Sequence, residues 1–353
     1  KTASIGYLYE MLEGQVAVLS SGMLSGEESR QLLESLRRSQ LYRADQHSYI
    51  LYPDRKLPGF LEKNCVTPEQ VSGLRLVAEL IKTNDKSLFL RSEDGNYRFS
   101  GSIHNAKDVN RLLDTLQSPY PNLVEHEREK ILMLFENIFH HNEFTGRSGT
   151  FFAYEGLGSI YWHMVSKLLL AVQETIIRTR TESSTAALIE IYIDIRKGLS
   201  FNKSPKVYGA FPVDPYSHTP KGQGAKQPGM TGMVKEEILT RQKELGCSIE
   251  NGQLVFDFLL LDKNEFLTEP AEFRYRDIEG NPAQIELPAG SIAYSICQVP
   301  VILQTSDKQG MAVHLSDGSV QQIDGHILDI ANSRHILQRD GVIHHLAVYV
   351  PVK

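Results

Sequence analysis

The chain has 353 residues, of which 41% are hydrophobic and 23% charged, and its formal net charge is −6. These values are typical of a globular protein with a sizeable core divided among two or three domains. Lysine and arginine are scattered rather than clustered, which excludes nucleic acid and anionic membrane surfaces as the main partners. No apolar run reaches the ~18 residues of a membrane span, so we expect no membrane insertion and a soluble protein, cytoplasmic or periplasmic.

Cysteine and histidine usage predicts neither disulfides nor a metal site. Cys65, Cys247 and Cys297 are odd in number and far apart, so they form neither a disulfide framework nor a zinc site. The adjacent His140 and His141 lie in a loop and lack a recognised ligand spacing. We therefore expect no metal ion and no cofactor.

Residues up to about 246 are predicted to be mainly helical, because their apolar side chains recur near every 3.6 residues. Ser25 followed by Glu28 predicts a capped helix start, and Thr67 with Pro68 and Gln70 predicts another. The apolar stripes lie, in chain order, at residues 32–36, 74–81, 109–116, 131–138, 157–172, 188–195 and 234–245. We place a helical domain at residues 1–246.

Beyond Gly246 the pattern changes to short runs rich in Val, Ile and aromatic residues. The runs lie at residues 254–261, 272–276, 291–305 and 344–350, and turn sequences such as Asp317-Gly318 and Asp340-Gly341 separate them. This pattern predicts an antiparallel, β-sandwich-like C-terminal domain at residues 247–353.

Three long connections interrupt the helical part, at residues 40–66, 140–156 and 200–230. Helices joined alternately by short and long connections pack as hairpins, which leaves the long connections on one side. The predicted fold class is therefore mainly α with C-terminal β: an (α/α) toroid of antiparallel helix hairpins followed by a β module. We expect the three loops to border one cleft, because long polar loops are usually binding loops.

The residues predicted to carry chemistry lie in these loops. Hydrolysis of a glycosidic bond needs two acidic functions, which we expect from Asp45, Glu155 and Asp214. Cleavage by phosphate needs one acid and donors that hold the anion, which a helix N-terminus can supply. Six further residues are predicted to bind substrate: Arg147, Tyr154, Tyr216, His218, Thr231 and Gly232. The alternative for each acid is a structural role, as a helix cap or in a solvated turn.

The sequence DPYSHTPKGQGAKQPGMTGMV, residues 214–234, resembles the C-terminal motif of the cellobiose and chitobiose phosphorylase family. That family includes the phosphorylase domain of cyclic β-1,2-glucan synthases. GRSGTFFAYEGLGSIYWHM resembles its Gly-Gly-x-Tyr-x-His segment more loosely, and LVFDFLLLDKNEF is similar to its closing β segment. The resemblance covers residues 140–290, approximately. It implies an (α/α)6 barrel flanked by β modules, with phosphate held by Thr231 and the backbone of Gly232.

Two departures from the family pattern bear on the reaction. The Trp-Asn-Asp motif of the family's catalytic acid is absent, and Tyr154 with Glu155 stand where the family has a phosphate-contacting histidine. A carboxylate at that position would repel phosphate. These departures favour hydrolysis over phosphorolysis.

The leading interpretation is a carbohydrate-active enzyme that cleaves a glycosidic bond in a glucan-like oligosaccharide or polysaccharide. In a hydrolase, Asp45 or Asp214 would act as acid and Glu155 as base, while Arg147 and His218 position sugar hydroxyls.

In a phosphorylase, His218, Thr231 and Arg147 would bind inorganic phosphate instead. Two alternatives remain open: a non-catalytic carbohydrate-binding or structural part of a larger multi-domain protein, and a polysaccharide lyase that uses Tyr216 with His218.

Overall fold

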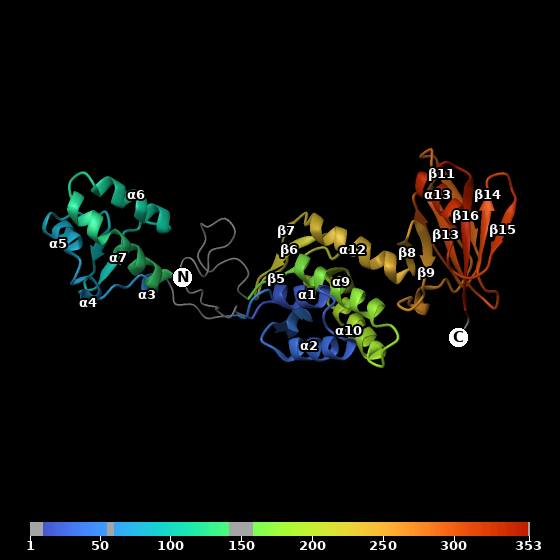
Figure 1. Cartoon of the computed structure of the whole chain (residues 1–353), viewed down its shortest axis with the longest axis horizontal. Helices are drawn as coiled ribbons and strands as arrows, with labels where there is room; N and C mark the ends of the chain where they lie inside the picture. Colours follow the sequence, from blue (N-terminus) through green and yellow to red (C-terminus); the bar gives the residue numbers. More distant parts are fainter. Residues whose placement is uncertain (1–9, 55–59, 141–157, 352–353) are drawn as a thin grey trace. The chain divides into compact units, whose positions relative to one another are not determined.

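The computed structural model describes residues 10–54, 60–140 and 158–351. Its contacts divide the chain into two compact units, Lys1–Met230 and Thr231–Lys353; Figure 1 shows the elements of both. The division falls before helix α12 (Thr231–Glu244), whereas the sequence places the boundary after it, at 246/247. The predicted domain limits stay a prediction.

Residues 10–54 and 158–230, here called the host segment, contain helices that pack on each other. α1 packs on α9, and α2 packs on α9 and α10, as Figure 1 shows in blue and green. The predicted capping box of α2 is confirmed, because Ser25 and Glu28 each accept a backbone N–H of the other. The helices are α1 (Leu12–Ser20), α2 (Gly26–Arg38), α9 (Trp162–Arg178), α10 (Thr185–Lys197) and the short α11 (Pro205–Tyr208).

Short strands occur within the first and third predicted loops. β1 (Tyr42–Arg43) and β2 (Ser48–Tyr49) form a hairpin around the 3-10 turn η1 (Ala44–Gln46). β5 (Ile160–Tyr161), β6 (Tyr216–Thr219) and β7 (Lys226–Pro228) form a three-stranded antiparallel sheet. The 3-10 turn η2 (Ser200–Asn202) precedes α11.

Residues 60–140, here called the inserted domain, have a hydrophobic core of their own. The core gathers apolar side chains from Val66 to Phe139. The predicted capping box of Thr67 and Gln70 is confirmed at the start of α4, but the hairpin of β3 and β4 was not predicted. The elements are α3 (Phe60–Lys63), α4 (Pro68–Val71), α5 (Arg75–Lys82), β3 (Phe89–Arg91), β4 (Tyr97–Phe99), α6 (Ala106–Leu116) and α7 (Pro121–Phe139).

The two parts of the host segment meet where the chain leaves for the inserted domain and where it returns. The backbone N–H of Leu51 donates to the carbonyl oxygen of Ser159, at 3.2 Å. Beside this bond, Gly158 has φ +63°, and a Cβ atom there would lie 2.7 Å from Oδ1 of Asp54. Exit and return are therefore adjacent, which is the geometry of a domain inserted into another fold.

The C-terminal unit is built on a five-stranded sheet with the order β12-β13-β16-β14-β15. β13 and β16 pair in parallel, and the other neighbours are antiparallel. One hydrophobic core joins this sheet to the β8–β9 hairpin and to α13. The strands are β8 (Cys247–Glu250), β9 (Gln253–Phe256), β10 (Ala271–Arg276), β11 (Pro282–Leu287), β12 (Ser291–Ile296), β13 (Val299–Ser306), β14 (Met311–Leu315), β15 (Val320–Ile323) and β16 (Ile343–Pro351); the helix is α13 (Ile330–Gln338), and η3 (Lys263–Glu265) is a 3-10 turn.

The predicted fold class, an (α/α) toroid followed by an antiparallel β module, is wrong. The described helices do not form a ring, since those at residues 60–140 surround a separate core, and the C-terminal sheet is mixed rather than antiparallel. The physical reason is that a 3.6-residue apolar stripe shows that a helix face is buried but not which element buries it.

Candidate functional site

The first and third predicted loops meet at Arg43. Its Nη1 donates to the carbonyl oxygen of Thr219 at 2.8 Å and to that of Gly158 at 3.3 Å. Thr219 ends strand β6, and Gly158 follows the second predicted loop. One guanidinium group thus links three regions that are distant in sequence, and its fixed fork of donors suits this bridging role.

Asp45 is held by the same arginine. Nε and Nη2 of Arg43 donate to the two carboxylate oxygens of Asp45 at 2.8 and 2.9 Å. These hydrogen bonds hold the pKa of Asp45 below its usual range. A carboxyl group that stays ionised is a poor proton donor, so this environment suits a base or an electrostatic partner better than an acid.

A lysine that the sequence analysis did not single out lies in the same cluster. Nζ of Lys203 is 4.3 Å from the ring centroid of Trp162 and 3.5 Å from Oε1 of Gln46. Trp162 is fully buried, as expected for a core residue, and its indole N–H donates to Oγ1 of Thr219 at 2.8 Å. Burial and the nearby Arg43 lower the pKa of Lys203 to about 7.

Tyr216 and His218 lie on one side of strand β6, because they are two residues apart. The imidazole of His218 stacks on Tyr161 with ring centroids 4.9 Å apart, and its Nδ1 is 2.7 Å from Oγ of Ser217. The ring of Tyr216 meets Tyr208 edge to face at 5.8 Å. Aromatic and imidazole faces at such a position suit stacking against a sugar ring.

Of the remaining predicted site residues, the structure describes Asp214, Thr231 and Gly232. Asp214 is exposed in the turn before β6. Thr231 and Gly232 begin α12 in the C-terminal unit. Three predicted residues lie outside the described residues: Arg147, Tyr154 and Glu155. The structure therefore brings Asp45 near the strand of His218 through Arg43, and the assignment of catalytic roles stays a prediction.

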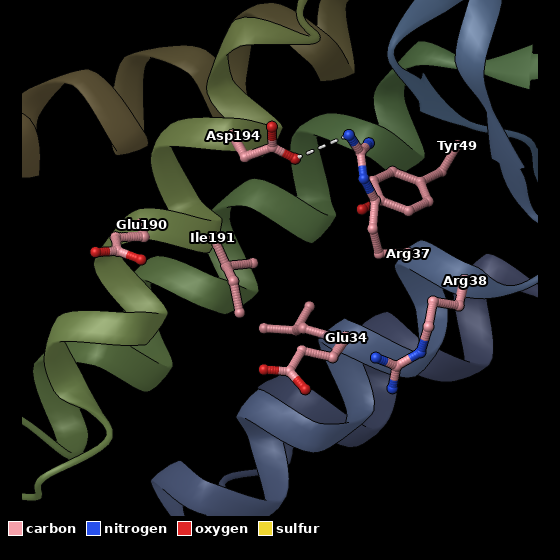
Figure 2. A pocket seen from close by; sticks show the side chains of 8 residues that line it. Glu34, Arg37, Arg38, Tyr49, Glu190, Ile191 and Asp194 are labelled. Carbon is pink, nitrogen blue, oxygen red and sulfur yellow. Dashed lines mark ion pairs between the residues drawn. The ribbon is translucent and has the colours of Figure 1, made fainter.

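A groove of about 280 Å³ lies between α2 and α10. Figure 2 shows Arg37 and Asp194 reaching toward each other from the two helices, with Tyr49 beside them; Nη2 of Arg37 is 3.5 Å from Oδ2 of Asp194. The guanidinium of Arg37 also lies 3.6 Å from the ring centroid of Tyr42. The groove is lined by Leu33, Glu34, Arg37, Arg38, Tyr49, Glu190, Ile191 and Asp194.

His47 connects this groove to the β1–β2 hairpin. Its Nε2 is 2.9 Å from Oδ1 of Asp194, and its Nδ1 is 3.1 Å from the hydroxyl of Tyr42. Because a carboxylate only accepts, Nε2–H is the donor, and Nδ1 of the neutral ring accepts from Tyr42. Burial raises the pKa of Tyr42 and raises that of Tyr49 to about 12, so both remain phenols at neutral pH. This chain of hydrogen bonds fixes the orientation of the His47 ring.

The backbone at His47 is under local constraint. His47 has φ +45°, in the left-handed region that non-glycine residues rarely adopt. A Cβ atom at Gly198 would lie 2.0 Å from the carbonyl oxygen of His47, so only glycine fits there. The sequence places His47 in a candidate loop, but nothing in it indicates Asp194, which occupies an ordinary position on the helix α10.

Within residues 10–54, 60–140 and 158–351, no group of three or more His, Cys, Asp or Glu side chains is arranged to hold a metal ion. Over the same residues, no helix combines the length and the apolar character that crossing a bilayer requires.

Residues 57–142 match the family model described as GH149 phosphorylase insertion domain 2. No curated protein matches the chain. The match covers the inserted domain, whose flanking host residues Leu51 and Ser159 are hydrogen bonded to each other. It supports a GH149-like, phosphorylase-related region. It does not support the more specific resemblance to cellobiose and chitobiose phosphorylases, which rests on other residues.

Proposed function

We propose that this chain is part of a glycoside phosphorylase that cleaves a glucan-like oligosaccharide with inorganic phosphate. The observation that carries the proposal is the match of residues 57–142 to a phosphorylase insertion domain. The geometry at Leu51 and Ser159 supports it, because a segment matched to an insertion leaves and re-enters a separate fold at one place.

In this reaction a phosphate oxygen attacks the anomeric carbon, the glycosidic C–O bond breaks, and an acid protonates the leaving oxygen. Only one carboxyl group is needed. Because Arg43 occupies both carboxylate oxygens of Asp45, we assign the acid role to Asp214. His218 on β6, with Arg147 as a further candidate, would hold phosphate.

Product analysis with and without phosphate tests the proposal. The 353-residue chain is incubated at pH 7 with β-linked gluco-oligosaccharides, and sugar 1-phosphate and new reducing ends are measured. Phosphate-dependent sugar 1-phosphate is the expected result. Reducing ends formed without phosphate would identify a hydrolase. Neither product, with oligosaccharide binding retained in calorimetry, would identify a non-catalytic carbohydrate-binding part of a larger protein.

A variant pair tests the assignment of the acid. Asp214→Asn is expected to lower turnover by about 10²-fold or more, the usual contribution of a general acid. Asp317→Asn changes another exposed aspartate, in the turn between β14 and β15, and is expected to leave turnover unchanged. Equal activity of both variants and the parent chain would remove Asp214 from the mechanism.

A further inference from the structure

Arg43 uses nearly all of its hydrogen-bond donors within the chain. Nε and Nη2 donate to the carboxylate of Asp45, and Nη1 donates to the carbonyl oxygens of Thr219 and Gly158. Four of the five N–H groups of this guanidinium are therefore engaged, and its side chain is 10% exposed. Such a group has little left to offer a ligand, so its role is to hold segments of the chain in place.

The carbonyl oxygen that Arg43 binds most closely belongs to the residue that follows His218. Thr219 is fully buried, and its Oγ1 accepts the indole N–H of Trp162 at 2.8 Å. Because successive side chains of a strand point to opposite faces, the burial of Thr219 directs His218 to the other face of β6. There the imidazole stacks on Tyr161. The bond from Arg43 thus fixes the end of the strand that carries His218.

The second carbonyl oxygen lies at the junction of the inserted domain. Gly158 follows that domain in the chain, and its oxygen is 3.3 Å from Nη1 of Arg43. The turn between β6 and β7 has another link to the same junction, since Nζ of Lys221 is 2.7 Å from Oδ2 of Asp54. That pair is exposed, with side-chain exposures of 74% and 43%, so water screens its attraction. Arg43 is the buried link of these two.

We propose that Arg43 is a positioning residue for His218. It holds the end of β6 against the junction of the inserted domain, so that the imidazole of His218 keeps the orientation in which it binds phosphate. The role of His218 in binding phosphate rests on the proposed function, whereas the link from Arg43 to His218 rests on the hydrogen bonds themselves. Arg43 acts through His218 and is assigned no contact with phosphate or sugar.

The NMR signal of the His218 imidazole measures this orientation in the intact chain. Because the ring stacks on Tyr161 with centroids 4.9 Å apart, the ring current of the tyrosine displaces the signal of the carbon-bound imidazole protons. The signal is assigned by its loss in His218→Asn. In Arg43→Gln we expect it to move toward the position of an unstacked histidine. In Lys221→Gln, which removes the exposed link to the same junction, we expect it to stay in place.

The kinetic measurement is the KM for phosphate in the sugar 1-phosphate assay. A misplaced group that binds phosphate equally in the ground state and the transition state raises KM and leaves kcat unchanged. We expect Arg43→Gln to raise the KM for phosphate by about tenfold or more, the usual worth of a hydrogen bond to a charged group, with a smaller change in kcat. Lys221→Gln should change neither. A loss of folded protein alone would lower the apparent kcat and leave KM unchanged.

Arg43→Lys is the second variant, for the case that Arg43→Gln does not fold. Lysine keeps the positive charge but has a single ammonium group in place of the planar fork of donors, so the His218 signal should move in this variant as well. Circular dichroism checks the folding of each variant.

The two measurements separate the inference from the proposed function. A His218 signal that keeps its wild-type position in a folded Arg43 variant would overturn the positioning role, whatever the activity. A wild-type chain without phosphate-dependent turnover would instead remove the phosphorylase assignment, while a displaced His218 signal would still support the link to Arg43.

Discussion

The backbone N–H of Leu51 donates to the carbonyl oxygen of Ser159 at 3.2 Å, so host residues on either side of the inserted domain in the sequence are neighbours in space. The inserted domain is attached to the host segment at one place and has a hydrophobic core of its own. A domain of this kind can in principle fold alone.

We therefore predict that residues 57–142, expressed alone, form a stable domain. Its core buries side chains from α4 to α7 and from the β3–β4 hairpin without help from the host segment. Circular dichroism should show a helical spectrum and a cooperative thermal transition. A gradual, non-cooperative loss of signal would show that the inserted domain depends on the rest of the chain.

Glu127 is predicted to be a stabilising residue of the inserted domain. Its buried carboxylate accepts the backbone N–H groups of Arg75 and Leu76, at 2.8 and 2.9 Å, at the start of α5. Glu127→Ala should lower the free energy of unfolding by about 1–3 kcal/mol, because these donors lose their partner. Urea denaturation measures the loss, and Glu125→Ala on the exposed side of α7 is the control. Equal effects of the two substitutions would contradict the capping role.

Gly198→Ala is predicted to destabilise the host segment by about 3 kcal/mol or more, since its Cβ would lie 2.0 Å from the carbonyl oxygen of His47. Gly14→Ala in α1 is the matched control, because its Cβ meets its nearest atom at an ordinary 3.5 Å and alanine favours a helix. Thermal denaturation of the full chain should separate the two variants. A Gly198→Ala variant as stable as the parent would show that the hairpin at His47 can shift.

The C-terminal unit is predicted to lose stability in acid through His345. Its ring stacks on His314 with centroids 4.0 Å apart, and its Nδ1 is 2.8 Å from Nδ1 of His344. Burial, then the two neighbouring histidines, lower the pKa of His345 from 6.5 to about 4. The unfolded chain therefore binds a proton that the folded chain does not, and stability falls as the pH drops from about 6.5 to 4.

The expected loss is on the order of 1–2 kcal/mol, since the ring is partly exposed to solvent. Urea denaturation of the chain at pH 7, 5.5 and 4.5 measures this loss of stability. A spectroscopic probe placed in the C-terminal unit monitors the unfolding. His345→Asn should flatten the decline, whereas His335→Asn on α13 should retain it. A decline of equal size in both variants would assign the acid sensitivity to other groups.

The sequence by itself determined the features that depend on neighbours within a few residues. The capping boxes at Ser25 and Thr67 start helices as expected, and the turn at Asp317-Gly318 joins the antiparallel strands β14 and β15. The strands of the five-stranded sheet lie after Gly246, as the sequence indicates, although in the described part of the chain seven short strands precede it and α13 follows it. In the capping boxes the side chain that fixes the backbone is three residues from the group it binds, and the turn at Asp317-Gly318 itself favours a glycine.

Only the tertiary structure decided which elements pack together and which residues they bring into contact at the candidate site. The parallel pairing of β13 with β16, the separate core of the inserted domain and the contact of His47 with Asp194 all join residues far apart in the chain. An apolar period shows that a helix face is buried but not which element buries it. The predicted toroid was wrong for this reason. The amine of Lys203 likewise looks like any other lysine until Trp162 and Arg43 are placed beside it, because burial and neighbouring charge are properties of the fold.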